Sequence, residues 1–160
     1  MSEILLGSHV GMSGKEMFLG SVKEAESYGA NVLMVYTGAP QNTRRKEIGE
    51  LRIDEGISYA EKAGIREIVI HAPYIINLGN MEKPEMFDFG VEFLAKEVKR
   101  AAAFHSKVLV LHPGSSLSAG VEASVEQIAK GLNLVLDADD SEVNIALETM
   151  ASKGSEVGRT

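Results

Sequence analysis

The chain has 160 residues, of which 44% are hydrophobic, it contains no cysteine, and its formal net charge at pH 7 is −7. This length suits one globular domain. The sequence lacks a run of about 18 apolar residues, so it predicts no membrane-spanning helix. Without cysteine, disulfides and thiolate metal sites are excluded, so a metal ion would need histidine and carboxylate ligands. The N-terminus has neither the basic segment nor the apolar core of a signal peptide, which predicts a cytoplasmic protein with no membrane partner.

The negative net charge, taken alone, argues against a nucleic-acid-binding protein, because such proteins usually carry a basic surface. A local basic cluster combined with bound metal cations could still attract phosphate. The one basic run is the Arg-Arg-Lys of residues 44–46. Its simplest interpretation is the solvated start of a helix.

The chain begins with an apolar run that predicts a strand over residues 4–9. Ser13 and Glu16 have the spacing of a capping box, in which two side chains satisfy free backbone N–H groups at a helix start. The helix that begins there should reach Tyr28, with Gly29 as its C-terminal stop.

A second strand is predicted over residues 31–36, followed by a loop over residues 37–43 that contains glycine and proline. A second helix is predicted over residues 46–63, closed by Gly64. The third strand, residues 67–71, is a short apolar run that a proline soon ends, as is typical of a buried parallel strand.

A long loop separates the third strand from a helix that Pro84 begins and that ends near His105. Residues 107–112 predict the fourth strand, and residues 143–147 the fifth. Between them lies a helix whose apolar residues recur every three or four positions and form one face. These residues are Val121, Val125, Ile128, Leu132 and Val135.

Strands that alternate with helices imply a parallel sheet. His71 and His112 are 41 residues apart, and His112 and Glu148 are 36 apart, whereas a (β/α)₈ barrel averages about 31 residues per unit before insertions. No Gly-x-Gly-x-x-Gly follows the first strand, which disfavours a dinucleotide-binding fold. We therefore expect an α/β protein of the (β/α)₈ TIM barrel type, with about the first five strands and four helices present.

Three potential metal ligands stand at the C-terminal ends of successive predicted strands, namely His71, His112 and Glu148. In a barrel these ends surround one pocket, where active sites lie. Two imidazoles and a carboxylate suit Zn²⁺ or a similar divalent ion, and the two oxygens of Glu148 could bridge two ions. A lone histidine is more often a packed or surface residue, so it is the alignment of three positions that favours a metal site.

His9 also ends a predicted strand and could line the same pocket or support a ligand, a more plausible role for it than direct metal binding. His105 precedes the fourth strand at the opposite end of the barrel, where an imidazolium merely suits a helix C-terminus. Tyr74 and Asn77 follow His71 in a loop at which binding groups could concentrate. The sequence shows no nucleophile elbow and no phosphate loop, so metal-assisted chemistry is the reaction class that its residues support.

Motifs at five places make the chain resemble the endonuclease IV family, the zinc-dependent apurinic/apyrimidinic endonucleases of base-excision repair. The most specific is the signature His-x-x-Tyr-apolar-x-Asn-apolar-Gly, which residues 71–79 fit. The other motifs lie, in the family's order, at residues 7–10, 36–44, 111–114 and 147–149. The resemblance covers nearly the whole chain.

This resemblance implies a barrel of the xylose-isomerase-like type with three Zn²⁺ ions in the complete enzyme. His71 and His112 match zinc ligands, and Glu148 matches a catalytic carboxylate that bridges two ions. The implied reaction is hydrolysis of the phosphodiester bond 5′ to an abasic site in double-stranded DNA. Bound zinc ions would also weaken the objection from the negative net charge, because they add positive charge where phosphate binds.

Further residues match the family's DNA-binding groups, namely Gln41, Asn42, Arg44 and Tyr74. The resemblance implies that they enter the minor groove and help to open the duplex at the abasic site.

The family's remaining zinc ligands come from later strands, including an Asp-Thr-Cys-His segment that these 160 residues do not contain. We therefore expect residues 1–160 to be the N-terminal portion of a single barrel domain. A complete enzyme should be a monomer, whereas the isolated portion should self-associate through exposed apolar edges and have impaired activity.

Two other functions stay open at this point. A metal-dependent sugar isomerase or epimerase can share this barrel and its His/Glu ligands. A non-enzymatic alternative is an inactive half-barrel that self-associates or pairs with a separate C-terminal half.

Overall fold

A computed structural model describes residues 4–151 and 153–158. In this part of the chain, five strands and four α-helices alternate, with one 3₁₀ turn before the second helix. The elements are β1 (Gly7–His9), α1 (Met17–Ser27), β2 (Val32–Tyr36), η1 (Ile48–Glu50), α2 (Ile53–Ala63), β3 (Glu67–His71), α3 (Pro84–Ala103), β4 (Val108–Leu111), α4 (Val121–Asp137) and β5 (Asn144–Leu147).

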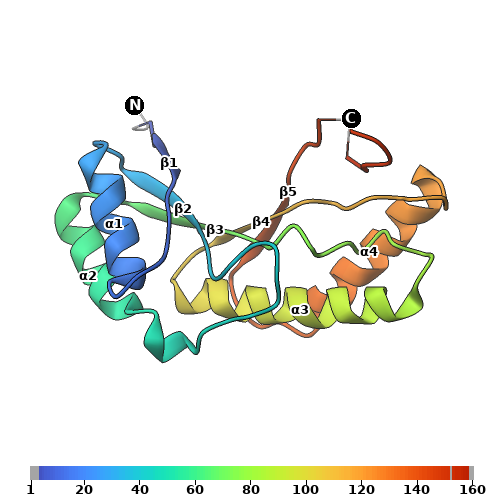
Figure 1. The fold of residues 1–160 in the computed structure, drawn as a ribbon, viewed down its shortest axis with the longest axis horizontal. Helices are drawn as coiled ribbons and strands as arrows, with labels where there is room; N and C mark the ends of the chain where they lie inside the picture. Colours follow the sequence, from blue (N-terminus) through green and yellow to red (C-terminus); the bar gives the residue numbers. More distant parts are fainter. Residues whose placement is uncertain (1–3, 152, 159–160) are drawn as a thin grey trace.

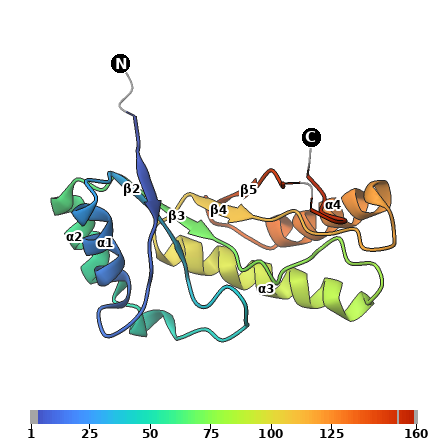
Figure 2. The same cartoon turned by 45° about the horizontal axis from the view of Figure 1, so that its top comes forward.

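The five strands pair in parallel and in sequence order, from β1 to β5. A doubly wound sheet would reverse its strand order partway, so this order is that of a barrel wall and confirms the predicted partial (β/α)₈ architecture. Figure 1 shows α1 and α2 beside the strands at the left and α3 below them, with β1 and β5 rising at the two ends of the sheet. The view in Figure 2 agrees, since α3 and α4 again lie together on one side of the strands.

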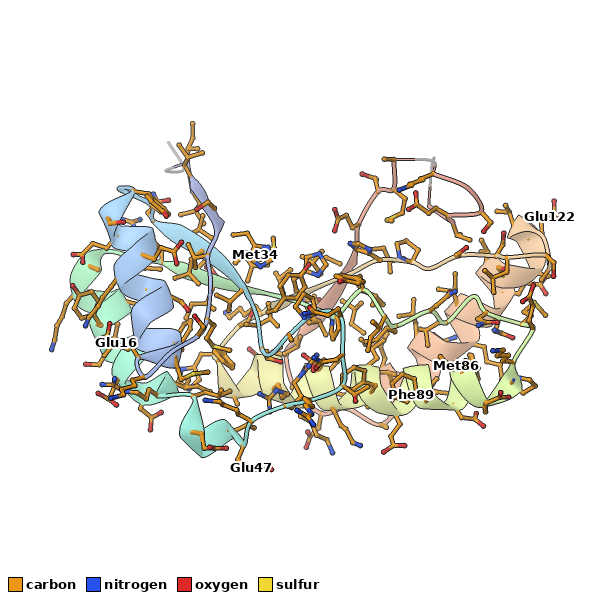
Figure 3. All side chains as sticks on the ribbon, viewed as in Figure 1. Glu16, Met34, Glu47, Met86, Phe89 and Glu122 are labelled. Atoms are coloured by element: carbon orange, nitrogen blue, oxygen red, sulfur yellow. The ribbon has the colours of Figure 1, made fainter. Side chains whose placement is uncertain are left out.

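Alternation of side chains along the strands divides the sheet into two faces. Leu33 and Val35 of β2, with Ile70 and Leu109 of the next two strands, are at most 1% exposed. Val35, Ile70 and Leu109 are direct neighbours in the strand register. Together with Phe18 and Phe104 they belong to one hydrophobic core. The intervening positions form the opposite face, on which Figure 3 shows Met34 away from α3.

Four of the five predicted strands match β2 to β5 within two residues. The first strand is shorter than expected, because the backbone of residues 4–6 is held by a side chain. Asn31 accepts a hydrogen bond from the Leu6 amide at 2.7 Å and donates one to the Ile4 carbonyl at 3.1 Å. Ladder pairing therefore begins only at Gly7.

The predicted capping box of Ser13 and Glu16 is wrong. Helix α1 begins at Met17, and its N-cap residue, Glu16, makes no capping hydrogen bond through its side chain. The Phe18 amide is satisfied instead by the carbonyl of Leu51, 3.1 Å away. A backbone group from a distant segment thus does what a local side chain was expected to do.

The same contact explains why the second predicted helix is divided. Residues 46–63 form the short η1 turn and then α2, with Arg52 between them at a left-handed φ of 54°. Leu51 is fully buried while its carbonyl caps α1. The predicted end of this helix is confirmed, because Gly64 adopts a φ of 76° at its C-cap.

The apolar face of α4 is only partly covered. Ile128 and Val135 are buried, but Val121 and Val125 are 53% and 47% exposed. Leu147 on the neighbouring β5 is 49% exposed, and β5 pairs on one side only, with β4. None of the helices in the described part of the chain is long and apolar enough to cross a membrane.

Packing between α1 and α2 gives a test of the core. A Cβ on Gly56 would lie 2.4 Å from Cδ1 of Phe18, so Gly56→Ala should overpack this contact. We expect it to lower the free energy of unfolding by about 1–3 kcal/mol, although alanine is the better helix former. Urea denaturation measures the change. Gly49→Ala is the control, because nothing lies within 4 Å of its added Cβ, and equal losses in both variants would contradict the contact.

Candidate metal centre

The strand register carries three polar side chains to one place. Val110 pairs with Ala146, and His112 and Glu148 follow two residues later, on the same face of the sheet. His71 ends β3 and pairs with Val110, so it lies on that face one step below His112. The three residues come from successive strand ends, as the sequence predicted.

Their ligand-capable atoms lie within 4.8 Å of one another. Nε2 of His71 is 3.0 Å from Oε2 of Glu148, and Nε2 of His112 is 3.2 Å from the same oxygen. The two imidazole ring centroids are 5.1 Å apart and nearly perpendicular, at 75°. Within the described residues this is the one such group of three histidine or acidic side chains.

The orientation of His71 is fixed by the backbone next to it. Its Nδ1 lies 2.7 Å from the carbonyl oxygen of Ala72, which can only accept a hydrogen bond, so Nδ1 carries the proton. In the neutral imidazole, Nε2 then presents a lone pair toward the Glu148 carboxylate. Two acceptors at 3.0 Å require a cation or a proton between them.

These distances suit a divalent ion. Two ligands at about 2.0–2.1 Å from a tetrahedral Zn²⁺ lie about 3.3 Å apart, close to the 3.0 and 3.2 Å separations seen here. A metal-binding histidine usually donates a hydrogen bond from its other ring nitrogen to a carbonyl or carboxylate. The contact between Nδ1 of His71 and the Ala72 carbonyl is of this kind. Both carboxylate contacts use Oε2 of Glu148.

Two aromatic rings flank the group on the side of β1. The ring of Tyr36 lies 4.8 Å from that of His71 and 4.6 Å from that of His9. His9 is outside the metal-capable group, and its ring lies 6.1 Å from that of His71. Partial burial lowers the pKa of His9, and the nearby charge of His71 lowers it further. Burial also raises the pKa of Tyr36, with smaller contributions from Glu148 and Tyr74.

The predicted DNA-binding residues lie apart from the three ligands, on loops at the same end of the strands. Gln41, Asn42 and Arg44 are exposed in the segment between β2 and η1. Tyr74, three residues beyond His71, is 51% exposed. A cavity of about 920 Å³ lies beside the Arg44 segment, with His9, Tyr36 and Arg44 among its lining residues.

Asn77 has a structural function that the sequence pattern did not reveal. Its Oδ1 accepts hydrogen bonds from the amides of Gly79 and Ser115, and its amide group donates to the Ser115 carbonyl. It therefore joins the loop that carries Tyr74 to the loop that follows His112. Gly114 permits this close approach, since a Cβ there would lie 2.4 Å from Oδ1 of Asn77.

Sequence reasoning also missed a buried polar cluster beneath the Arg44 segment. Glu97 and Arg100 of α3 are 0% and 8% exposed. In the sequence, the two charged residues stand one turn apart among the apolar residues of α3. This interruption could have indicated a buried polar cluster. The basic run was interpreted as a solvated helix start, but the Arg45 side chain is only 11% exposed and binds Glu97.

Comparisons with known proteins show which proteins this chain is similar to. A protein from Lachnoclostridium phytofermentans named probable endonuclease 4 is 62% identical over 154 residues, which are 96% of this chain and 51% of the relative. One of the same name from Lysinibacillus sphaericus is 59% identical, with 98% of this chain and 52% of the relative covered. The chain thus spans about half the length of these curated relatives.

Among solved structures, endonuclease IV from Thermus thermophilus superposes with a TM-score of 0.79 at 26% identity, covering 96% of this chain and 55% of that one. A D-tagatose 3-epimerase-like protein superposes with a TM-score of 0.69 at 20% identity, which shows the shared fold alone. The family described as xylose isomerase-like TIM barrel matches residues 22–160. The chain belongs to this family, and the relatives described above are named probable endonuclease 4.

Proposed function

We propose that this chain is the N-terminal portion of a zinc-dependent DNA-repair endonuclease that hydrolyses the phosphodiester bond 5′ to abasic sites. One observation carries the proposal: His71, His112 and Glu148 meet at a single point of a partial barrel whose relatives, at about 60% identity, are named probable endonuclease 4. Residues 1–160 would then form one part of a single barrel domain.

In this proposal His71 and His112 hold zinc through Nε2, and Glu148 provides the carboxylate ligand. Zinc bound there would stabilise negative charge on the phosphoryl group and lower the pKa of a water molecule. The Ala72 carbonyl keeps the correct nitrogen of His71 free for the metal. The second oxygen of Glu148 could serve as a ligand to another ion, and the resemblance implies three Zn²⁺ ions in the complete enzyme.

The DNA would lie across the loops at this end of the strands. Arg44 offers an exposed guanidinium for phosphate or for the minor groove, and Gln41 and Asn42 offer exposed amides beside it. Tyr74 lies three residues beyond His71 and carries a large exposed ring. A side chain that inserts between base pairs has to be large and exposed in this way. We expect the complete enzyme to bind abasic duplex as a monomer.

The alternative of a sugar isomerase or epimerase has weaker support. The epimerase-like structure is only 20% identical to this chain, whereas the relatives at 62% and 59% identity are named as endonucleases. Turnover of a free ketose without nicking of abasic DNA would reverse the choice. Sedimentation with and without zinc tests the half-barrel alternative, in which the chain self-associates or pairs with a separate C-terminal half.

The metal centre can be tested by thermal unfolding. Zn²⁺ at about a hundred times its Kd should stabilise the chain by about 2.7 kcal/mol, which raises Tm by about 5–10 °C in a domain of this size. His112→Asn should abolish the shift. His105→Asn is the matched control, because His105 is exposed and asparagine tolerates its φ of 55°. An equal zinc shift in both variants would contradict the site.

Catalysis by the isolated chain should be weak. Only three ligand side chains gather within the described residues, so we expect weak zinc binding and nicking of an abasic duplex at least about a hundredfold slower than by a full-length relative. A gel assay of 5′-labelled duplex measures the rate, with a chelator as the metal-free control. Robust metal-dependent nicking by the purified 160-residue chain would show this expectation to be wrong.

DNA binding should depend on the exposed loop residues. Arg44→Ala and Tyr74→Ala should each weaken binding of an abasic duplex by about tenfold, because a charged contact or an inserted ring is lost. Fluorescence anisotropy measures the Kd. Lys107→Ala makes the same charge change at the amino end of β4, opposite the metal centre, and should leave the Kd unchanged. The interface is misplaced if Lys107→Ala weakens binding as much as Arg44→Ala.

A further inference from the structure

The segment between β2 and η1, residues 37–46, is held from below by a cluster that we call the arginine clamp: Thr37, Arg45, Glu97 and Arg100. Glu97 is fully buried, and Thr37 is 1% exposed. The segment carries the exposed side chains Gln41, Asn42 and Arg44, and it passes in front of α3 near Phe89 (Figure 3). None of the clamp residues belongs to the metal-capable group.

Arg100 joins the two ends of the segment. Its Nε donates to Oγ1 of Thr37 and its Nη2 donates to the Thr37 carbonyl, each at 3.0 Å. Its Nη1 donates to the carbonyl of Lys46, also at 3.0 Å. One rigid guanidinium therefore fixes the distance between the first and the last residue of the loop.

Arg45 ties down the interior of the segment. Its Nη1 lies within hydrogen-bonding distance of three backbone carbonyls, 3.3 Å from Ala39, 3.1 Å from Asn42 and 2.8 Å from Arg44. Its guanidinium carbon sits 4.9 Å from the centre of the Phe93 ring. The backbone around Arg44 is thus shaped by the side chain of the next residue.

Glu97 connects the two arginines. Its Oε1 accepts from Nε of Arg45 at 2.6 Å, and its Oε2 accepts from the hydroxyl of Thr37 at 2.7 Å, while that hydroxyl oxygen accepts from Arg100. Glu97 and Arg100 are one turn apart on α3, so a rigid helix sets their spacing. Burial lowers the pKa of Arg100, and the nearby carboxylate of Glu97 opposes that shift.

Stability alone does not account for this arrangement. A buried ion pair gives little net stabilisation, because desolvation offsets the attraction between the charges. Its value is conformational, since this set of hydrogen bonds forms in one loop geometry only, and within the described residues Nη2 of Arg45 is buried without a hydrogen-bond partner. Gly38 is matched to that geometry, because a Cβ there would lie 2.8 Å from Cδ of Arg45.

We propose that Glu97, Arg45 and Arg100 are positioning residues that hold residues 37–46 in the conformation in which Arg44 meets DNA. The part of this inference that concerns DNA rests on the proposed function. The ordering of residues 37–46 by the clamp does not depend on it. The clamp also sets this loop relative to the metal centre, because Thr37 follows Tyr36, whose ring contacts that of His71 at 4.8 Å.

The first measurement is hydrogen exchange of the full chain at residues 38–46. Arg45→Lys keeps one cation but cannot bind Glu97 and the three loop carbonyls together, as Nε and Nη1 of the arginine do, and Glu97→Gln removes the central charge. We expect amides of the segment to exchange at least about tenfold faster in both variants. Glu92→Gln is the control, because Glu92 makes an exposed ion pair with Lys96 on the same helix. Wild-type exchange in Arg45→Lys would overturn the proposal, even if Glu97→Gln does not fold.

The second measurement separates positioning from a merely structural role. Arg45→Lys should raise the Kd for an abasic duplex about tenfold in the wild-type background but less than about twofold in the Arg44→Ala background, because both changes act through one contact. Equal effects in both backgrounds would overturn positioning through Arg44. Zinc affinity should stay unchanged in every variant. If the wild-type chain binds no DNA while the variants loosen the loop, the proposed function fails and the loop-ordering role of the clamp survives.

Discussion

The candidate site depends on one constraint, the register of the parallel strands. Side chains alternate between the two faces of a strand, so a slip of one residue would turn His71 toward the helices and Ile70 toward the pocket. The buried row of Val35, Ile70 and Leu109 prevents such a slip, because each member fills the core beneath the sheet. The same packing that stabilises the barrel wall therefore aims the imidazoles and the Glu148 carboxylate.

This constraint explains how much of the molecule could be predicted from the sequence. Each strand is a short apolar run with a clear end, so the order of the strands and the three candidate ligands at their ends followed from the local pattern. The strand ends were informative because parallel strands bring their carboxyl ends to one edge of a sheet. The residue pattern singled out Tyr74 as a loop residue past His71 and Arg44 as part of a basic run, but the DNA-binding role expected of them came from the resemblance alone.

What the sequence could not predict depends on contacts between distant segments. The Leu51 carbonyl replaces the expected Ser13 cap and divides the predicted second helix in the same step. Likewise, a charged residue on the apolar stripe of α3 makes sense only when its partners arrive from a loop about 50–60 positions earlier. Thr37 and Arg45 supply hydrogen bonds to both carboxylate oxygens of the buried Glu97. A short stretch of sequence around either partner gives no indication of the other.

The basic run at residues 44–46 shows why whole-chain charge was a poor guide to the partner. Its middle member, Arg45, is used inside the protein against Glu97, whereas Arg44 and Lys46 remain exposed. The cationic surface offered to a phosphate is therefore small and local, and its geometry is set by the clamp. Divalent ions at the neighbouring histidines would extend that surface. In the proposed function, a chain with a net charge of −7 would thus present a local phosphate-binding face without a change in the sign of its overall charge.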